Sequence, residues 1–165
     1  MDLRRVVRHM FMTRWQVDRA FPHRTLRAIE KAIQTSHHAH IGQVRFAVDG
    51  ALHVSELRRG TTARERAIDV FSELRVWDTE HNNGILIYLL LADRDVEIVA
   101  DRGVHARVHA AEWERICKKM EANFKLAKYE VGVLKGIEEV TELLTRHFPI
   151  QQELRSELPS KPTVL

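Results

Sequence analysis

The sequence predicts an α/β fold in which helices cover both faces of a small mixed sheet. Three observations lead to this prediction. Short strand-like segments alternate with longer amphipathic ones, a helical segment joins the first two strands, and a tight polar turn joins the last two. Because a helical crossover makes neighbouring strands parallel and a tight turn makes them antiparallel, the sheet must be mixed.

Four segments predict the helices of this fold. In the first, Leu26, Ile29 and Ile33 recur at helical spacing, and in the second Thr61 or Thr62 stands where an N-cap is expected. The predicted helices cover residues 25–38, 61–74, 105–126 and 131–147.

Three shorter segments predict the strands. Residues 43–48 alternate between apolar and polar side chains, and residues 85–91 form the near-continuous apolar run that is typical of a strand buried on both faces. Residues 92–95 make a tight polar connection to a third strand at 96–100. The second and third strands should therefore form a hairpin.

Length and composition favour one globular domain with an appendage at each end. The chain has 165 residues, of which 44% are hydrophobic and 30% charged, as in ordinary soluble domains. All four prolines lie outside residues 23–148 and all seven glycines inside, which marks a domain at 23–149. Residues 150–165 have little periodic apolar content, so we expect a mobile C-terminal tail there.

The apolar runs and the cysteine content of the chain indicate its cellular compartment. The longest apolar run, residues 85–92, is far short of the roughly 20 residues that a bilayer-spanning helix needs. Cys117 is the single cysteine, which excludes an internal disulfide framework and fits a reducing compartment. We therefore expect a cytoplasmic protein.

The positive charge of the chain is concentrated at its N-terminus. Residues 1–24 contain six arginines and two aspartates, whereas the rest of the chain carries slightly more acidic than basic groups. A nucleic-acid-binding domain would carry its Lys and Arg on the folded body. We therefore expect no nucleic-acid partner.

Residues 1–22, called the N-terminal arm below, predict a basic amphipathic helix. Its apolar stripe consists of Leu3, Val6, Val7, Met10 and Phe11, with Trp15 one turn later. Three interpretations are open: a helix packed on its own domain, which we favour, an anchor on anionic lipid, or a helix that binds a protein partner. In the last two interpretations the contact residues would be Arg4, Arg5, Arg8, Phe11 and Trp15.

A candidate cation site follows from the predicted hairpin. Because the hairpin reverses the chain, residues that enter the second strand share one sheet edge with residues that leave the third. Carboxylate and amide oxygens at this edge are ligands that a hard divalent cation prefers, and they come from Asp78, Asn82, Asn83 and Asp101. The alternative, which spacing alone favours, is that these side chains only form turns.

Other chemical signals in the sequence are weak. His37 with His40, and His105 with His109, are each spaced as a pair on one helical face, but no third zinc ligand is fixed by the sequence. The GxSxG, GxxxxGK[ST] and GxGxxG motifs are absent. Cys117 is in phase with the apolar stripe of its helix, so we interpret it as a core residue.

Several of these segments together resemble the TPM domain. They occur in the family's order and cover roughly residues 23–149. The segments are 67–74, Trp77-Asp78, Asn82-Asn83-Gly84, the strand and turn at 96–104, Trp113, Phe124, 132–137 and His147-Phe148-Pro149. The chain is most similar to the short soluble bacterial branch of the family.

The resemblance implies a Rossmann-like three-layer α/β/α sandwich with a four-stranded sheet. Since the sequence shows three strands, we expect the fourth at residues 51–54 or in the N-terminal arm. The resemblance also implies a cleft that binds Ca²⁺ or Mg²⁺ at Asp78, Asn82, Asn83 and Asp101. Asn82 stands where many members carry Asp, which should weaken cation binding. Arg102 would either neutralise Asp101 or contact a phosphate or carboxylate there.

These observations predict a TPM-domain binding module. We expect it to hold Ca²⁺ or Mg²⁺ weakly and to dock on an unidentified protein partner or, through the arm, on the inner membrane surface. The alternative is a metal-dependent acid phosphatase, an activity described for TPM domains elsewhere.

Overall fold

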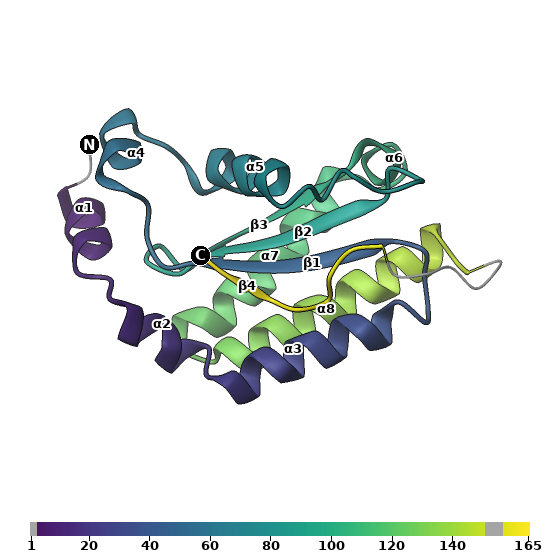
Figure 1. The fold of residues 1–165 in the computed structure, drawn as a ribbon, viewed down its shortest axis with the longest axis horizontal. Coiled ribbons are helices and arrows are strands. Elements are labelled where there is room, and N and C mark those ends of the chain that lie inside the picture. The colour runs from purple at the N-terminus through teal and green to yellow at the C-terminus, as the bar shows by residue number, and fades with distance from the viewer. Residues whose placement is uncertain (1–2, 151–156) are drawn as a thin grey trace.

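The computed structural model describes residues 3–150 and 157–165 and shows a mixed sheet between two layers of helices (Figure 1). The strands are β1 Gln43–Asp49, β2 Gly84–Leu90, β3 Asp95–Ala100 and β4 Thr163–Val164. The helices are α1 Leu3–Met10, α2 Arg14–Ala20, α3 His23–Ser36, α4 Val54–Arg59, α5 Ala63–Glu73, α6 Arg102–His105, α7 Ala110–Lys125 and α8 Tyr129–His147. The predicted three-layer α/β fold is confirmed.

The sheet has the strand order β3-β2-β1-β4. β1 and β2 are parallel with Phe46 opposite Ile87, as expected for strands joined by a helical crossover. β2 and β3 are antiparallel with Ile87 opposite Ile98, so the predicted hairpin is confirmed. One end of the sheet, where β1 and β2 begin and β3 ends, is called the strand-entry edge below. The other end, where residues 91–94 turn the chain from β2 into β3, is called the hairpin edge.

Burial on both faces explains why β2 is apolar throughout. Alternate side chains of a strand point to opposite faces, and those of β2 enter two separate cores. Ile85, Ile87 and Leu89 pack in the core under α3, α7 and α8. Leu86, Tyr88 and Leu90 pack in the smaller core under α4 and α5. Within the described ranges, no helix is long and apolar enough to cross a membrane.

Capping residues divide two of the predicted helices. The arm breaks at Thr13, whose side chain accepts from the Gln16 backbone and starts α2. The predicted helix at 105–126 is wrong at its start, because Asp101 caps the short α6 and a new helix begins at Ala110. α4, which the sequence pattern did not predict, ends at Gly60 in the left-handed region.

The predicted position of the fourth strand is wrong. Residues 51–53 lead into α4 and the described part of the arm is helical, while β4 comes from the C-terminus and pairs with β1. Leu158 is buried, and Gln43 Oε1 accepts from the Glu157 and Leu158 backbones. Residues 157–165 therefore pack on the sheet and do not form a mobile tail. Residues 151–156, and residues 1–2 of the arm, lie outside the described residues.

Candidate functional site

The N-terminal arm docks on the hairpin edge through a histidine. His9 is only 4% exposed, and its Nδ1 accepts a hydrogen bond of 3.0 Å from the Leu52 backbone. Its Nε2 lies 3.1 Å from the Asp93 carboxylate. The polar face of α1 is therefore the face that contacts the body of the protein.

Asp93 is the partner of the arm's basic side chains. Arg5 Nε donates to one carboxylate oxygen at 2.8 Å, and Arg8 Nη2 donates to the other at 2.9 Å. Burial alone would raise the pKa of Asp93, but hydrogen bonds and charges from Arg5 and His9 lower it below its ordinary value. No sequence pattern indicates this pairing, because it joins Arg5 to a residue 88 positions away.

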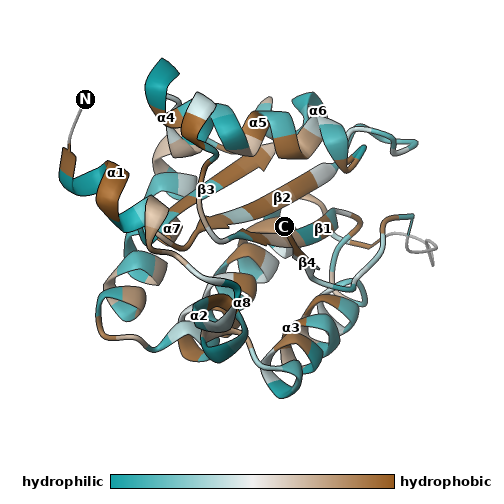
Figure 2. Cartoon of the chain, turned by 60° about the vertical axis from the view of Figure 1, so that its left-hand side comes forward, coloured by the Kyte–Doolittle hydropathy of each residue, from teal (hydrophilic) through white to brown (hydrophobic). Residues whose placement is uncertain are grey.

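The apolar face of the arm points away from the body. Leu3 is 70% exposed, Phe11 73% and Trp15 65%, and Figures 1 and 2 show α1 at the periphery of the molecule. The stripe of α1 and Trp15 therefore does not pack, so the interpretation of a helix packed on its own domain is wrong for α1.

The second half of the arm does pack on the domain, because Val17 and Phe21 are buried in the larger core. The pairing of the buried His9 with Asp93 holds α1, whose large apolar side chains stay in solvent.

At the strand-entry edge, the structure brings together Asn82, Asp101 and Arg102. Asp101 Oδ1 accepts from the Arg102 backbone at 2.7 Å, while Arg102 Nε donates to Asn82 Oδ1 at 3.0 Å. The second carboxylate oxygen of Asp101 is buried and has no hydrogen-bond partner among the described residues. The β2–β3 hairpin thus brings these residues together, as predicted, and one acceptor oxygen of Asp101 is left unused among the described residues.

Asn83 contributes a second unused oxygen at this edge. Its side chain is 1% exposed, and its Nδ2 donates to the Ile41 backbone at 2.6 Å. Its Oδ1 is buried without a hydrogen-bond partner within the described residues. Asp78 differs, because it is exposed in the turn after α5, where its backbone N–H donates to the Arg75 carbonyl. Three of the four predicted cation ligands therefore gather around β2 and β3, and Asp78 stays at their periphery.

Two glycines allow the backbone to close tightly at the strand-entry edge. A Cβ on Gly84 would lie 1.8 Å from the Val76 carbonyl oxygen, and a Cβ on Gly103 would lie 2.6 Å from the Asn82 carbonyl oxygen. Only glycine can accept such contacts. The Asn83-Gly84 and Arg102-Gly103 pairs therefore fix where the side-chain oxygens of Asn83 and Asp101 lie.

The histidine pairs are not arranged as a metal centre in the part of the chain that the structure describes. His40 is 2% exposed, and burial first, then the neighbouring His37, lowers its pKa to about 4. His37 Nε2 accepts from the Val44 backbone at 3.3 Å. His105 ends α6 and His109 precedes α7, so they do not share a helix. Among the residues that the structure describes, no group of three or more His, Cys, Asp and Glu side chains is arranged to hold a metal ion.

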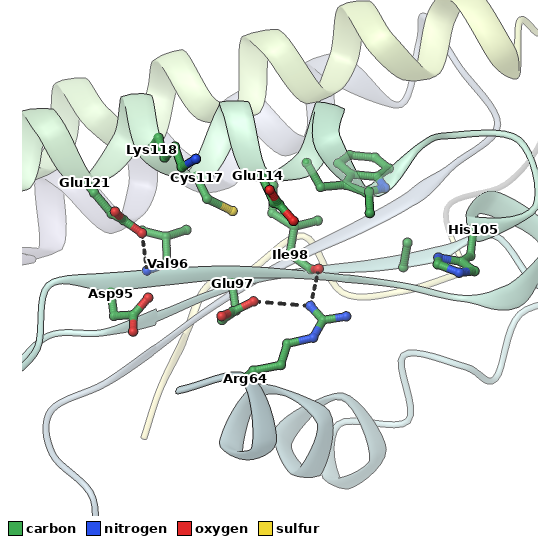
Figure 3. Close-up of a pocket in the computed structure, with 13 residues that line it drawn as sticks. Arg64, Asp95, Val96, Glu97, Ile98, His105, Glu114, Cys117, Lys118 and Glu121 are labelled. Atoms are coloured by element: carbon green, nitrogen blue, oxygen red, sulfur yellow. Dashed lines mark hydrogen bonds and ion pairs between the residues drawn. The ribbon is translucent and has the colours of Figure 1, made fainter. Parts of the chain in front are cut away.

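A groove of about 460 Å³ runs along β3, the edge strand, between α5 and α7 (Figure 3). Four carboxylates line it, and Arg64 crosses it to donate to the Ile98 carbonyl at 2.7 Å. Burial, followed by the charges of Glu121 and Glu97, raises the pKa of Asp95 to about 6. Strand alternation at Asp95 and Glu97 could have indicated this acidic face. The lining carboxylates are Asp95, Glu97, Glu114 and Glu121.

Cys117 lies at the wall of this groove and points from α7 toward β3 (Figure 3). It is 8% exposed and belongs to the larger core, which confirms its interpretation as a core residue. Burial raises the pKa of its thiol to about 12, with Glu97 and Glu121 adding to the effect. A thiol in this state is a poor nucleophile.

Comparisons with known proteins agree on the fold. The family model of the TPM domain matches residues 19–143. The solution structure of BA42 from the psychrophilic bacterium Bizionia argentinensis is 26% identical, with a TM-score of 0.75 over 86% of this chain and 92% of that one. The N-terminal domain of a P. gingivalis protein is 16% identical, with a TM-score of 0.58 over 74% and 76%. A search of curated proteins finds no match.

Proposed function

Because this chain belongs to the TPM domain family, we propose that it is a binding module that docks on an anionic membrane surface through its N-terminal arm. One observation carries the proposal: α1 is held to the domain by its polar face, and its apolar face, together with Trp15, is left in solvent. An amphipathic helix in this orientation can lie in the membrane interface while the domain stays outside.

The exposed side chains suit the interface between lipid and water. Phe11 and Trp15 offer large apolar surfaces, and burying each is worth roughly 1.5–3 kcal/mol. Arg14, whose side chain is 70% exposed, pairs with Asp18 at 3.4 Å, and Arg8, at 55%, pairs with Asp93. The positive charge of the arm comes from its excess of arginine over aspartate, and an arginine near an anionic lipid surface contributes about 1 kcal/mol. This combination suits the cytoplasmic face of the inner membrane, which we propose as the site of action.

Vesicle binding tests this proposal. We expect the protein to sediment with phosphatidylcholine vesicles that contain phosphatidylglycerol, and salt should weaken the binding. Trp15→Ser should reduce binding at least tenfold, whereas Trp77→Ser, a change at a 51% exposed tryptophan on the body, should not. If the intact protein ignores anionic vesicles, membrane docking is wrong and the arm is better explained as a helix that binds a protein partner.

Weak cation binding at the strand-entry edge is the second function that an observation favours. Asp101 Oδ2 and Asn83 Oδ1 are buried acceptors without partners in the described structure, and a hard cation such as Ca²⁺ or Mg²⁺ binds such oxygens. The fit is partial, because Asn82 already accepts from Arg102 and the guanidinium opposes a nearby cation. We therefore propose an affinity that is low, in keeping with an asparagine at position 82.

Calorimetry and chemical-shift mapping with Ca²⁺ and Mg²⁺ test the cation proposal. Asp101→Asn should weaken binding by removing a negative charge, and Asn82→Asp should strengthen it. Asp95→Asn, at the far end of β3, is the control and should leave the affinity unchanged. Cation binding without hydrolysis of an aryl phosphate would favour a binding module, and metal-dependent hydrolysis at acidic pH would favour the phosphatase alternative, in which Arg102 contacts the phosphate.

A further inference from the structure

A hollow of about 820 Å³ lies between the arm and the hairpin edge. The arm contributes Phe11, Trp15 and Arg19 to its wall, and the body contributes Arg94 from the turn between β2 and β3. Tyr129, at the start of α8, lines the far side. The hollow therefore opens beside the exposed apolar face of the arm.

The charge of this hollow is positive. Three guanidinium groups line it, from Arg8, Arg19 and Arg94. Among the described lining residues only Asp93 is acidic, and it is already paired with Arg5, Arg8 and His9. Positive charge thus remains for a ligand from outside.

The positions of two of the arginines are defined by the surrounding structure. Arg19 lies over the Trp15 ring, with its guanidinium carbon 5.3 Å from the ring centroid. Arg94 has a φ of 55°, which is an uncommon backbone conformation for a residue with a side chain. Its Nη1 donates a long hydrogen bond of 3.4 Å to the Lys125 carbonyl. Ala127, which also lines the hollow, has a φ of 56°. Such strain concentrates at functional sites.

We propose that this hollow binds the phosphate headgroup of an anionic phospholipid. Guanidinium groups bind phosphate oxygens through paired, charge-assisted hydrogen bonds. Phe11 and Trp15 would enter the apolar region next to the bound headgroup, where aromatic side chains are favoured. The inference rests on the proposed docking of the arm and adds a specific headgroup contact to it.

A free phosphate compound shares this chemistry but fits less of the site. A soluble ligand would use Arg19 and Arg94 and leave the exposed Phe11 and Trp15 in water. A phospholipid uses the charged and the apolar parts together. The structure therefore favours the lipid as the source of the phosphate.

Variants that separate headgroup binding from apolar insertion test the proposal. Arg94→Gln and Arg19→Gln should each weaken binding to phosphatidylglycerol-containing vesicles about tenfold, since a hydrogen bond to a charged group is lost. Arg115→Gln, which removes the same charge from an exposed position on α7, is the control and should change binding by about twofold or less. Circular dichroism of each variant checks that the fold is kept.

The outcomes distinguish this inference from the proposed docking. If Trp15→Ser abolishes vesicle binding while Arg94→Gln and Arg19→Gln behave like Arg115→Gln, the arm docks on membranes and the headgroup site is wrong. If the intact protein does not bind vesicles at all, both are wrong. In chemical-shift titrations, glycerol phosphate should perturb Arg94 and Trp15 weakly. Saturation by inorganic phosphate at lower concentration than by lipid would overturn the lipid as ligand.

Discussion

Asp93 and Asp101 are carboxylates at opposite ends of the β2–β3 hairpin, and their surroundings differ. At the hairpin edge, both oxygens of Asp93 are bound, by Arg5, Arg8 and His9. At the strand-entry edge, Asp101 uses one oxygen to cap α6, and the other has no partner among the described residues. The carboxylate of Asp93 is fully used by structural contacts, whereas that of Asp101 keeps one oxygen that a ligand could bind.

The difference shows how the same residue type serves two purposes in one small sheet. At the hairpin edge, the carboxylate of Asp93 has both oxygens bound and holds α1 so that its apolar face stays outside. Asp49, at the end of β1, is likewise bound by Arg66 and Tyr88. Buried acceptors without partners are rare in folded proteins and are costly to keep. Their presence at the strand-entry edge is the structural reason to look for a bound cation there.

The largest expected effect comes from replacing the aspartate at each end of the β2–β3 hairpin by asparagine. Asp93→Asn should lower the free energy of unfolding by about 3 kcal/mol, because it breaks a largely buried ion pair and leaves Arg5 and His9 without a negative partner. Asp101→Asn should cost less than about 1 kcal/mol, because asparagine caps a helix as well as aspartate does. Urea unfolding of the two variants measures the difference.

The reverse ranking in that experiment would contradict the comparison. Hydrogen exchange in α1 adds a local readout, since Asp93→Asn should release α1 while the sheet stays protected. Equal protection of α1 in the variant and in the parent protein would show that α1 does not depend on Asp93.

The fold could be predicted from sequence where the signal is local. The periods of α3, α5 and α8 and the apolar run of β2 reflect burial that repeats along the chain, so those elements are predicted correctly apart from their ends. β4 could not be found this way, because two residues have no periodicity and gain their stability from pairing with Val48 and Ala47 far away in sequence. The position of a strand this short is set by the sheet that it joins.

The candidate site shows the same limit. The hairpin placed Asn82 and Asp101 together because a tight turn dictates which residues meet. The orientation of α1 differs from the favoured interpretation, because an apolar stripe indicates which face would gain from burial and not whether the body offers a surface for it. Here the body offers Asp93 and the Leu52 backbone, and they select His9.

A smaller effect is expected in the pH dependence of stability, from the residue that begins β3. The pKa of Asp95 is raised to about 6, so the folded chain holds a proton there at pH values where the unfolded chain does not. Stability should therefore fall as pH rises from about 4 through 6, and it should be level above that. Asp95→Asn should remove this fall and raise the free energy of unfolding at neutral pH by about 1 kcal/mol. This value is smaller than the pKa shift alone would give, because solvent screens the charge.

Asp93 should act in the opposite direction. Its pKa is lowered in the folded state, so its stabilising effect is present above the ordinary pKa of an aspartate and is lost as pH falls.

Unfolding curves at pH 4 and pH 7 for Asp95→Asn and the parent protein measure the sign of the Asp95 effect on stability. If Asp95→Asn is less stable than the parent at neutral pH, burial and the charges of Glu121 and Glu97 do not destabilise the Asp95 carboxylate.

The smallest effect concerns backbone strain at the two ends. Arg94, in the hairpin turn, has a φ of 55°, and Asn82, at the strand-entry edge, has a φ of 50°. Asparagine tolerates this region, whereas arginine does so only at a cost of about 1 kcal/mol. Arg94→Gly should therefore raise the free energy of unfolding by up to about 0.5 kcal/mol, because relief of strain outweighs the greater freedom of glycine in the unfolded chain. The same variant should bind anionic vesicles more weakly, since the guanidinium is lost.

Asn82→Gly should have the opposite effect on stability. It removes the hydrogen bond from Arg102 and relieves little strain, so we expect a loss of about 1 kcal/mol. Thermal and urea unfolding of the two glycine variants measure both values. A stabilising Asn82→Gly together with a destabilising Arg94→Gly would place the strain at the strand-entry edge. In that case Arg94 would be held by packing at the hairpin turn, and its conformation would no longer support a role in headgroup binding.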